Sequence, residues 1–162
     1  MSKTDFTPTQ TDLHNFFDYK DGVLYWKVSK KCVNKGGIAG HTNYPRPYVQ
    51  ITINKRKFLA HRLIFKMFHG YLPKCVDHIN GIKNDNRIEN LREATLSQNN
   101  YNTKPKNTKK NISLYKKTGK WQVQIRANGK NIHLGYFLDL ELAELVATEA
   151  RNKYHGKFAR HN

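Results

Sequence analysis

The sequence predicts an α+β protein built in two parts. Residues 48–53 alternate between apolar and polar side chains and precede a tight connection at residues 54–56, which predicts a β-hairpin. Further along, three strand-like runs are separated by turn residues such as Asn128-Gly129, which predicts a three-stranded antiparallel sheet. An alanine-rich segment after Asp139 predicts one helix packed across that sheet.

Before the hairpin, the first part is expected to contain a short helix, a strand and a long loop. The helix is expected at residues 12–17, and the turn dipeptide Asp21-Gly22 leads into the strand-like residues 23–28. Residues 29–47 hold several glycines and prolines, so they are expected to form a loop.

A helix is expected directly after the hairpin, over residues 61–70. Its apolar side chains recur at helical spacing, and Gly70 is a natural C-terminal stop. We interpret this apolar face as core rather than as a functional surface. Its members are Leu63, Ile64, Met67 and Phe68.

A capping signal predicts another short helix further along. The four residues Thr-Leu-Ser-Gln that begin at Thr95 form a capping box, in which Thr95 caps the helix and Gln98 reaches back. Asn99 therefore lies in the first turns of that helix.

The second part is predicted from its turns and periodicity. The strands are expected at residues 112–117, 120–127 and 130–137, and the helix at Leu140–His155. Gly156 is expected to end this helix. The domain division that follows is a first domain at residues 1–100, a basic linker at residues 101–110 and a second domain at residues 111–162.

The net charge of the chain and its distribution indicate what kind of molecule the protein binds. The chain has 29 Lys and Arg against 12 Asp and Glu, a formal net charge of +17. Residues 22–76 and 96–138 contain no acidic residue and interleave cations with aromatic residues, which indicates surfaces that face a polyanion. Charge kept for solubility alone is the less favoured alternative, because solubility needs less charge of one sign.

Nucleic acid is a better partner than a membrane. The sequence has no apolar run near the ~20 residues of a spanning helix, and its start lacks the apolar segment of a signal peptide. Two isolated cysteines indicate a reducing compartment, with a Cys32–Cys75 disulfide as the less favoured alternative. Without a Cys-x-x-Cys pair, no structural zinc is expected.

The segment from Val76 to Thr95 carries the chemical signal. A structural loop rich in Asn and Gly is the default interpretation. Against it, Asp77-His78 follows an apolar residue on a predicted strand, and amides recur at Asn90 and Asn99. A carboxylate and an amide oxygen suit Mg²⁺, and His is matched to general-base work near neutral pH. Asn90 is placed where it can tie the loop and orient the His78 ring.

This segment, extended to Ala60 and Asn100, resembles the HNH endonuclease family, especially the phage and intron-encoded homing type. The resemblance implies a ββα-metal nuclease core with the hairpin and helix as its N-terminal scaffold. It implies that Asp77 and Asn99 bind one divalent metal, Mg²⁺ or Mn²⁺, that His78 is the general base, and that Asn90 supports the loop. Asn99 stands where many members have His, which favours Mg²⁺ over Zn²⁺.

The segments GKWQVQIR, IHLGYF and the helix ending YHGKFARHN resemble the AP2-type DNA-binding domain. In that family the sheet lies in the major groove, where Arg and Gln can read base edges and Lys can contact phosphates. An ordinary solvated sheet face is the alternative. Two of the expected DNA contacts have an alternative role: Arg87 could equally fasten its own loop, and Trp121 could belong to the core. The DNA-contacting residues that we expect over the whole chain are Lys55, Arg56, Lys57, Arg87, Arg92, Lys116, Lys117, Lys120, Trp121, Gln122, Gln124, Arg126, Lys130 and His133.

The sequence therefore predicts a metal-dependent DNA endonuclease that acts on double-stranded DNA in the cytoplasm of a bacterial or phage-infected cell. It predicts no small-molecule substrate and no membrane partner. One site per chain predicts nicking by a monomer or weak dimer on DNA. The alternatives are a non-catalytic, sequence-specific DNA-binding regulator and, less favoured, an RNA-binding protein.

Overall fold

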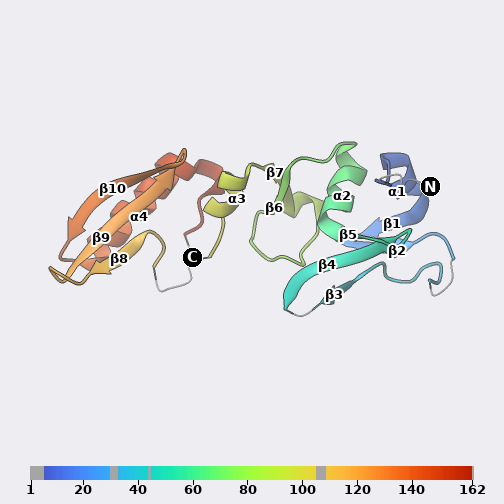
Figure 1. Ribbon diagram of the computed structural model, residues 1–162, viewed down its shortest axis with the longest axis horizontal. Coiled ribbons are helices and arrows are strands. Elements are labelled where there is room, and N and C mark those ends of the chain that lie inside the picture. Colours follow the sequence, from blue (N-terminus) through green and yellow to red (C-terminus); the bar gives the residue numbers. More distant parts are fainter. Residues whose placement is uncertain (1–5, 30–32, 44, 105–108, 162) are drawn as a thin grey trace. The chain divides into compact units, whose positions relative to one another are not determined.

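The computed structural model describes residues 6–29, 33–43, 45–104 and 109–161. Contacts divide the chain into two compact units, Met1–Glu93 and Ala94–Asn162. The α+β class is confirmed, with several small sheets and a few helices (Figure 1). Our division, which put residues 94–100 in the first domain, stays a prediction. Part of the expected linker, residues 105–108, lies outside the described residues.

The first unit begins with a capped helix and a hairpin. Helix α1 spans Gln10–Phe16, and the Thr9 side chain accepts a hydrogen bond from the Asp12 amide in a capping box. Strands β1 (Phe17–Lys20) and β2 (Val23–Trp26) then pair antiparallel. Strand β1 was not expected. Its first residue, Phe17, had been assigned to the preceding helix, and its apolar-polar alternation covers four residues only.

A three-stranded antiparallel sheet follows, in the order β3-β4-β5. Its strands are β3 (His41–Asn43), β4 (Arg46–Ile53) and β5 (Arg56–Leu59). The expected hairpin is therefore present, but the expectation of a continuous loop over residues 29–47 is wrong at β3. This strand is short and polar, and only its pairing with β4 makes it a strand.

Helix α2 (Ala60–His69) supplies much of the first core and ends at Gly70, which has φ of 79°. Leu63, Ile64 and Met67 are buried as expected, and each such side chain contributes about 1.5–3 kcal/mol when removed from water. Phe68 is 47% exposed, so its assignment to the buried face was wrong. It packs its ring against that of Tyr19 instead.

The first unit closes with a two-stranded sheet. Strand β6 spans Cys75–His78 and β7 spans Leu91–Ala94, with a 3-10 turn, η1 (Ile88–Asn90), just before β7. The prediction that Asp77-His78 lies on a strand is confirmed. The thiol of Cys75 is free, and Cys32 lies outside the described residues.

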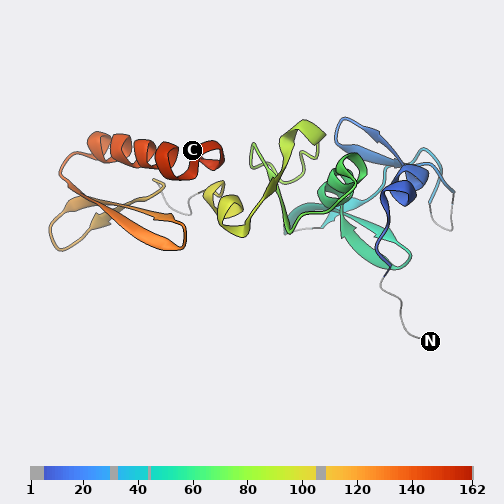
Figure 2. The same cartoon turned by 90° about the horizontal axis from the view of Figure 1, so that it is seen from above.

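The second unit begins with α3 (Leu96–Tyr101), where the predicted capping box of Thr95 and Gln98 is confirmed. The antiparallel sheet has the order β10-β9-β8, and α4 runs along one face of it (Figure 2). Val123, Ala143 and Ala147 form the centre of its core. The bounds are β8 (Ile112–Tyr115), β9 (Lys120–Ala127), β10 (Lys130–Phe137), α4 (Leu140–His155) and η2 (Gly156–Phe158).

The turn and capping residues of this unit adopt the conformations that the sequence predicted. Asn128 and Gly129 both have positive φ, 50° and 77°, as a two-residue hairpin turn requires. The Asp139 side chain accepts a hydrogen bond of 2.7 Å from the Leu142 amide and caps α4. Within the described residues, none of the helices combines the length and apolarity needed to cross a membrane.

Gly22 is the point at which the β1–β2 turn touches the β6–β7 loop. We expect Gly22→Ala to be less stable than Gly36→Ala by about 1–3 kcal/mol, the usual effect of overpacking. Both glycines have positive φ, 85° and 80°, but a Cβ at Gly22 meets the Arg87 nitrogen at 2.7 Å, whereas one at Gly36 meets nothing within 4 Å. Urea unfolding of the two variants measures the difference, and equal losses would contradict this packing.

Candidate active site

Strand β6 places an acidic and a basic side chain in the interior of the first unit. Asp77 and His78 are 0% and 1% exposed. The Asp77 carboxylate faces Arg92 on β7, whose Nε and terminal nitrogen lie 2.9 and 2.8 Å from Asp77 Oδ2. We expected Arg92 to hold phosphate. The structure pairs it with the carboxylate, which it neutralises and orients, and its contact with phosphate stays a prediction.

Asn86 orients the His78 ring. His78 Nε2 lies 3.0 Å from Asn86 Oδ1, and Asn86 is itself 2% exposed. Because a carbonyl oxygen accepts, Nε2 carries the proton and the lone pair is on Nδ1. Burial lowers the pKa of His78, although the Asn86 bond opposes this shift. The imidazole is therefore neutral at neutral pH, as a general base must be.

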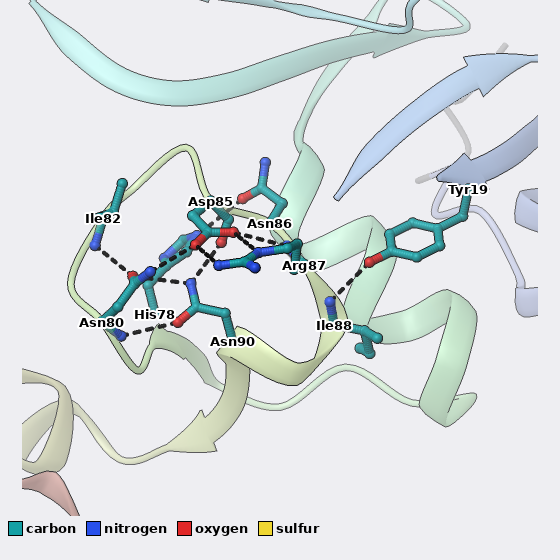
Figure 3. Close-up of polar contacts among 9 residues, drawn as sticks. All are labelled: Tyr19, His78, Asn80, Ile82, Asp85, Asn86, Arg87, Ile88 and Asn90. Atoms are coloured by element: carbon teal, nitrogen blue, oxygen red, sulfur yellow. Dashed lines mark hydrogen bonds and ion pairs between the residues drawn. The ribbon is translucent and has the colours of Figure 1, made fainter. Parts of the chain in front are cut away.

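Asn90 closes the loop between β6 and β7. Its Oδ1 accepts from the Asn80 amide at 3.0 Å, and its Nδ2 donates to Asn80 Oδ1 at 3.0 Å and to the Asp85 carbonyl at 2.7 Å (Figure 3). We expected Asn90 to support the loop and orient the His78 ring. The hydrogen bonds assign it to the loop, and the ring contact comes from Asn86.

A second set of contacts fixes the far side of the loop. Arg87 donates from Nε and a terminal nitrogen to the Asp85 carboxylate at 2.9 and 2.8 Å, and Asn80 Nδ2 donates to it at 2.7 Å. The Arg87 bonds hold the pKa of Asp85 well below its usual range. The Tyr19 hydroxyl accepts from the Ile88 amide at 2.9 Å (Figure 3). Arg87 thus fastens the loop, the alternative to its expected DNA contact, and the DNA contact itself stays a prediction.

Sequence reasoning missed Asn86 and His61. Four asparagines lie between residues 80 and 90, and nothing in their spacing separates the buried Asn86 from the exposed Asn84. His61 lies on α2, far from His78 in the chain, and its ring lies 4.9 Å from the His78 ring. Burial lowers the pKa of His61 to about 3.

The predicted metal ligands are one carboxylate and one amide. Asn99 lies on α3, in the second unit, so its pairing with Asp77 rests on the sequence and stays a proposal. Among the described residues no group of three or more His, Cys, Asp and Glu side chains is arranged to hold a metal. The chemistry of the proposed set, oxygen donors with most of the shell left to water and phosphate, fits Mg²⁺.

Three expected DNA contacts lie at the β4–β5 hairpin. Lys55 is in the turn with φ of 65°, and both Lys55 and Lys57 are exposed. Arg56 is half-buried, and its guanidinium lies 3.5 Å from the Phe6 carbonyl. The two lysines are therefore the better candidates for contact with a polyanion.

The second unit presents a polar sheet face opposite α4. Gln124 and Arg126 are exposed, and their register partners His133 and Asn131 lie on the same side. Part of this face is a shallow hollow of about 330 Å³ lined by polar groups that include Gln124, Arg126 and Asn131. The acids of this unit lie at and along α4, so the open face is cationic and the helix side carries the negative charge.

A β-bulge brings unexpected aromatic residues to the same face. The register of β10 shifts between His133 and Gly135, so Tyr136 pairs with Gln122. The Tyr136 ring lies 4.7 Å from that of His133 and 5.1 Å from that of Tyr115. Strict alternation would have put His133 and Tyr136 on opposite faces.

The other expected contacts of this unit fall into two groups. Trp121 packs against the core beneath α4, which favours a structural role over a DNA contact. Gln122 is half-buried and lies 3.4 Å from His133 Nδ1. Lysines at the turns are exposed, namely Lys116, Lys117 and Lys130. Lys120, at the start of β9, is half-buried.

Comparison with known proteins agrees with this geometry. Residues 58–101, which include α2, β6 and β7, match the family model described as HNH endonuclease, so this segment is similar to the HNH endonucleases. Over 108 residues the chain is 34% identical to Protein 3.8 of Escherichia phage T7, a match that covers 62% of this chain and 87% of that protein. The chain therefore belongs to the family of this phage protein. No solved structure shows a significant match.

Proposed function

We propose that the chain is a metal-dependent DNA endonuclease that hydrolyses phosphodiester bonds in double-stranded DNA and leaves 3′-hydroxyl and 5′-phosphate ends. The observation that carries this proposal is the buried His78, which follows Asp77 in the chain: burial keeps its imidazole neutral, and Asn86 orients the ring. A histidine that only fills space in the core would not need a loop residue that fixes which of its ring nitrogens carries the proton. The match to HNH endonucleases over residues 58–101 supports the same chemistry.

In the proposed reaction His78 acts as the general base. Its Nδ1 takes a proton from a water molecule whose oxygen attacks the phosphorus in line. The new P–O bond forms as the bond to the 3′-oxygen breaks, and that oxygen leaves with a proton from solvent. Asn86 keeps Nε2–H in place, so the accepting lone pair stays on the other ring nitrogen.

Asp77 and Asn99 are the proposed holders of a divalent ion, Mg²⁺ or Mn²⁺. When bound, the ion neutralises charge on the phosphate and on the departing 3′-oxygen. Arg92 fixes the Asp77 carboxylate through Oδ2, and burial protects this pair from solvent screening. One such site per chain favours nicking of one strand by a monomer or weak dimer.

The open sheet face of the second unit is the proposed DNA reader. Gln124, Arg126 and His133 project from neighbouring strands of a face that carries no acid. Such a face can enter a major groove, where Arg and Gln pair with purine edges. We also propose, from the sequence resemblance, that this unit is an AP2-type DNA-binding domain.

One observation favours a second candidate, a non-catalytic, sequence-specific DNA-binding regulator. Arg92 already neutralises the buried carboxylate of Asp77, so the fold does not depend on a metal there. In that case the HNH segment is a scaffold for the DNA-binding surfaces.

Nicking of supercoiled plasmid in Mg²⁺ or Mn²⁺ separates these two candidates. We expect the wild type to nick and His78→Ala to lose about 10²–10⁴-fold in rate, the usual contribution of a general base. The matched control is His69→Ala, which removes an exposed histidine from α2 and should cut like the wild type. If His78→Ala cuts as fast as the wild type, His78 is not the base; a wild type that binds but never cuts is the regulator.

The reader face is tested by the salt dependence of binding to a mixed-sequence duplex. We expect Lys130→Ala, at the edge of this face, to weaken binding and to reduce the log–log salt slope by about 0.9, the effect of losing one phosphate contact. Lys153→Ala is the control, since it removes an exposed cation from α4, on the opposite side of the sheet. Equal losses in the two variants would place the contact elsewhere.

A further inference from the structure

A cluster of rings lies beside the proposed base and has no part in the mechanism above. His61, near the start of α2, is 5% exposed, and its ring centre lies 4.9 Å from that of His78 at an interplanar angle of 61°. Tyr48 on β4 lies 5.3 Å from His61 and 6.1 Å from His78. Three separate elements therefore converge on the base.

His61 is buried without a hydrogen bond. Among the described residues no partner faces its ring nitrogens, and leaving a buried polar group unsatisfied costs about 1–3 kcal/mol. Among the described residues, the side-chain nitrogen and oxygen atoms that are completely shielded from solvent and also lack a hydrogen-bond partner are Asn111 Oδ1 and His155 Nδ1, and the His61 nitrogens are not among them. The nitrogens of His61 therefore keep some access to solvent, and a ligand can reach them.

The surroundings of His61 suit an anion. The N-cap of α2, Leu59, offers no side-chain acceptor, so the first amide groups of this ten-residue helix have no capping side chain. A helix N-terminus of this kind attracts phosphate. Lys83 stands close by, with Nζ 5.9 Å from the centre of the Tyr48 ring.

The charge state of His61 is consistent with a donor role. Burial first, and then the positive surroundings that include Lys83, lower the pKa of His61 to about 3. The ring is neutral at neutral pH and still carries one N–H group. It can donate to a phosphate oxygen, while Lys83 supplies the positive charge.

We propose that His61, at the start of α2, and Lys83, in the loop between β6 and β7, bind a phosphate of the DNA backbone next to the bond that is cleaved with His78 as the general base. This inference rests on the proposed nuclease function and adds a substrate-contacting pair to it. The Tyr48 ring lies near both residues, 5.3 Å from the His61 ring and 5.9 Å from Lys83 Nζ. In this proposal a ring nitrogen of His61 donates a hydrogen bond to the phosphate. A ring without nitrogen atoms could pack against His78 in the same way but could not make this bond.

The test is His61→Phe, which keeps an aromatic ring against His78 and removes the nitrogen donors. We expect plasmid nicking to fall about 10²-fold, the usual loss for one phosphate-stabilising donor, with little change in the thermal midpoint. The control is His69→Phe, the same change at an exposed position of α2. Lys83→Met, compared with the exposed control Lys74→Met, should raise KM and weaken duplex binding in EDTA.

The outcomes separate the two proposals. If the wild type cuts and His61→Phe cuts within about twofold of it, packing alone explains His61 and the phosphate contact is wrong. If His61→Phe does not fold, Lys83→Met decides, and unchanged KM and binding overturn the inference. If the wild type does not cut in Mg²⁺ or Mn²⁺, the nuclease proposal fails, and this inference fails with it.

Discussion

The structure of the candidate active site depends on the side-chain amide of Asn90. Its three hydrogen bonds join the Asn80 backbone, the Asn80 side chain and the Asp85 carbonyl, so one residue next to β7 closes the loop that follows β6. The segment between residues 79 and 87 contains little apolar surface that could be buried for the same purpose. A polar network of this kind holds one geometry only when its members are satisfied.

The closed loop sets the chemistry of the base. Asn86 reaches His78 because Arg87 and Asp85, its neighbours, are locked together and because Tyr19 holds Ile88 from the β1–β2 hairpin. The scaffold at the start of the chain is thus part of the site through Gly22 and Tyr19. The second unit uses a different principle: one sheet separates a cationic face from a helix that carries the acids.

The local signals of the sequence predicted the fold well. The capping residues Thr95 and Asp139 and the turn at Asn128 act within a few residues, so their outcome does not depend on distant contacts. Strand β3 and the bulge at Gly135 were missed, because pairing with a neighbouring strand decides both.

The residues of the candidate site likewise fall into those that the sequence predicted and those that it did not. Asp77, His78 and Asn90 were found from their order in the chain and from a family resemblance. Asn86 was missed because asparagines two residues apart differ only in burial, and His61 because it reaches His78 from another element. Contacts of this kind need the three-dimensional arrangement.

The central claim is that burial keeps His78 a neutral imidazole and that the loop, through Asn86, keeps its proton on Nε2. The ¹⁵N chemical shifts of the His78 ring, measured by NMR at neutral pH in the metal-free protein, test it directly. The account predicts a protonated Nε2 and an unprotonated Nδ1, with this preference weakened in Asn86→Ala. A proton on Nδ1 alone, or a doubly protonated ring, would contradict it.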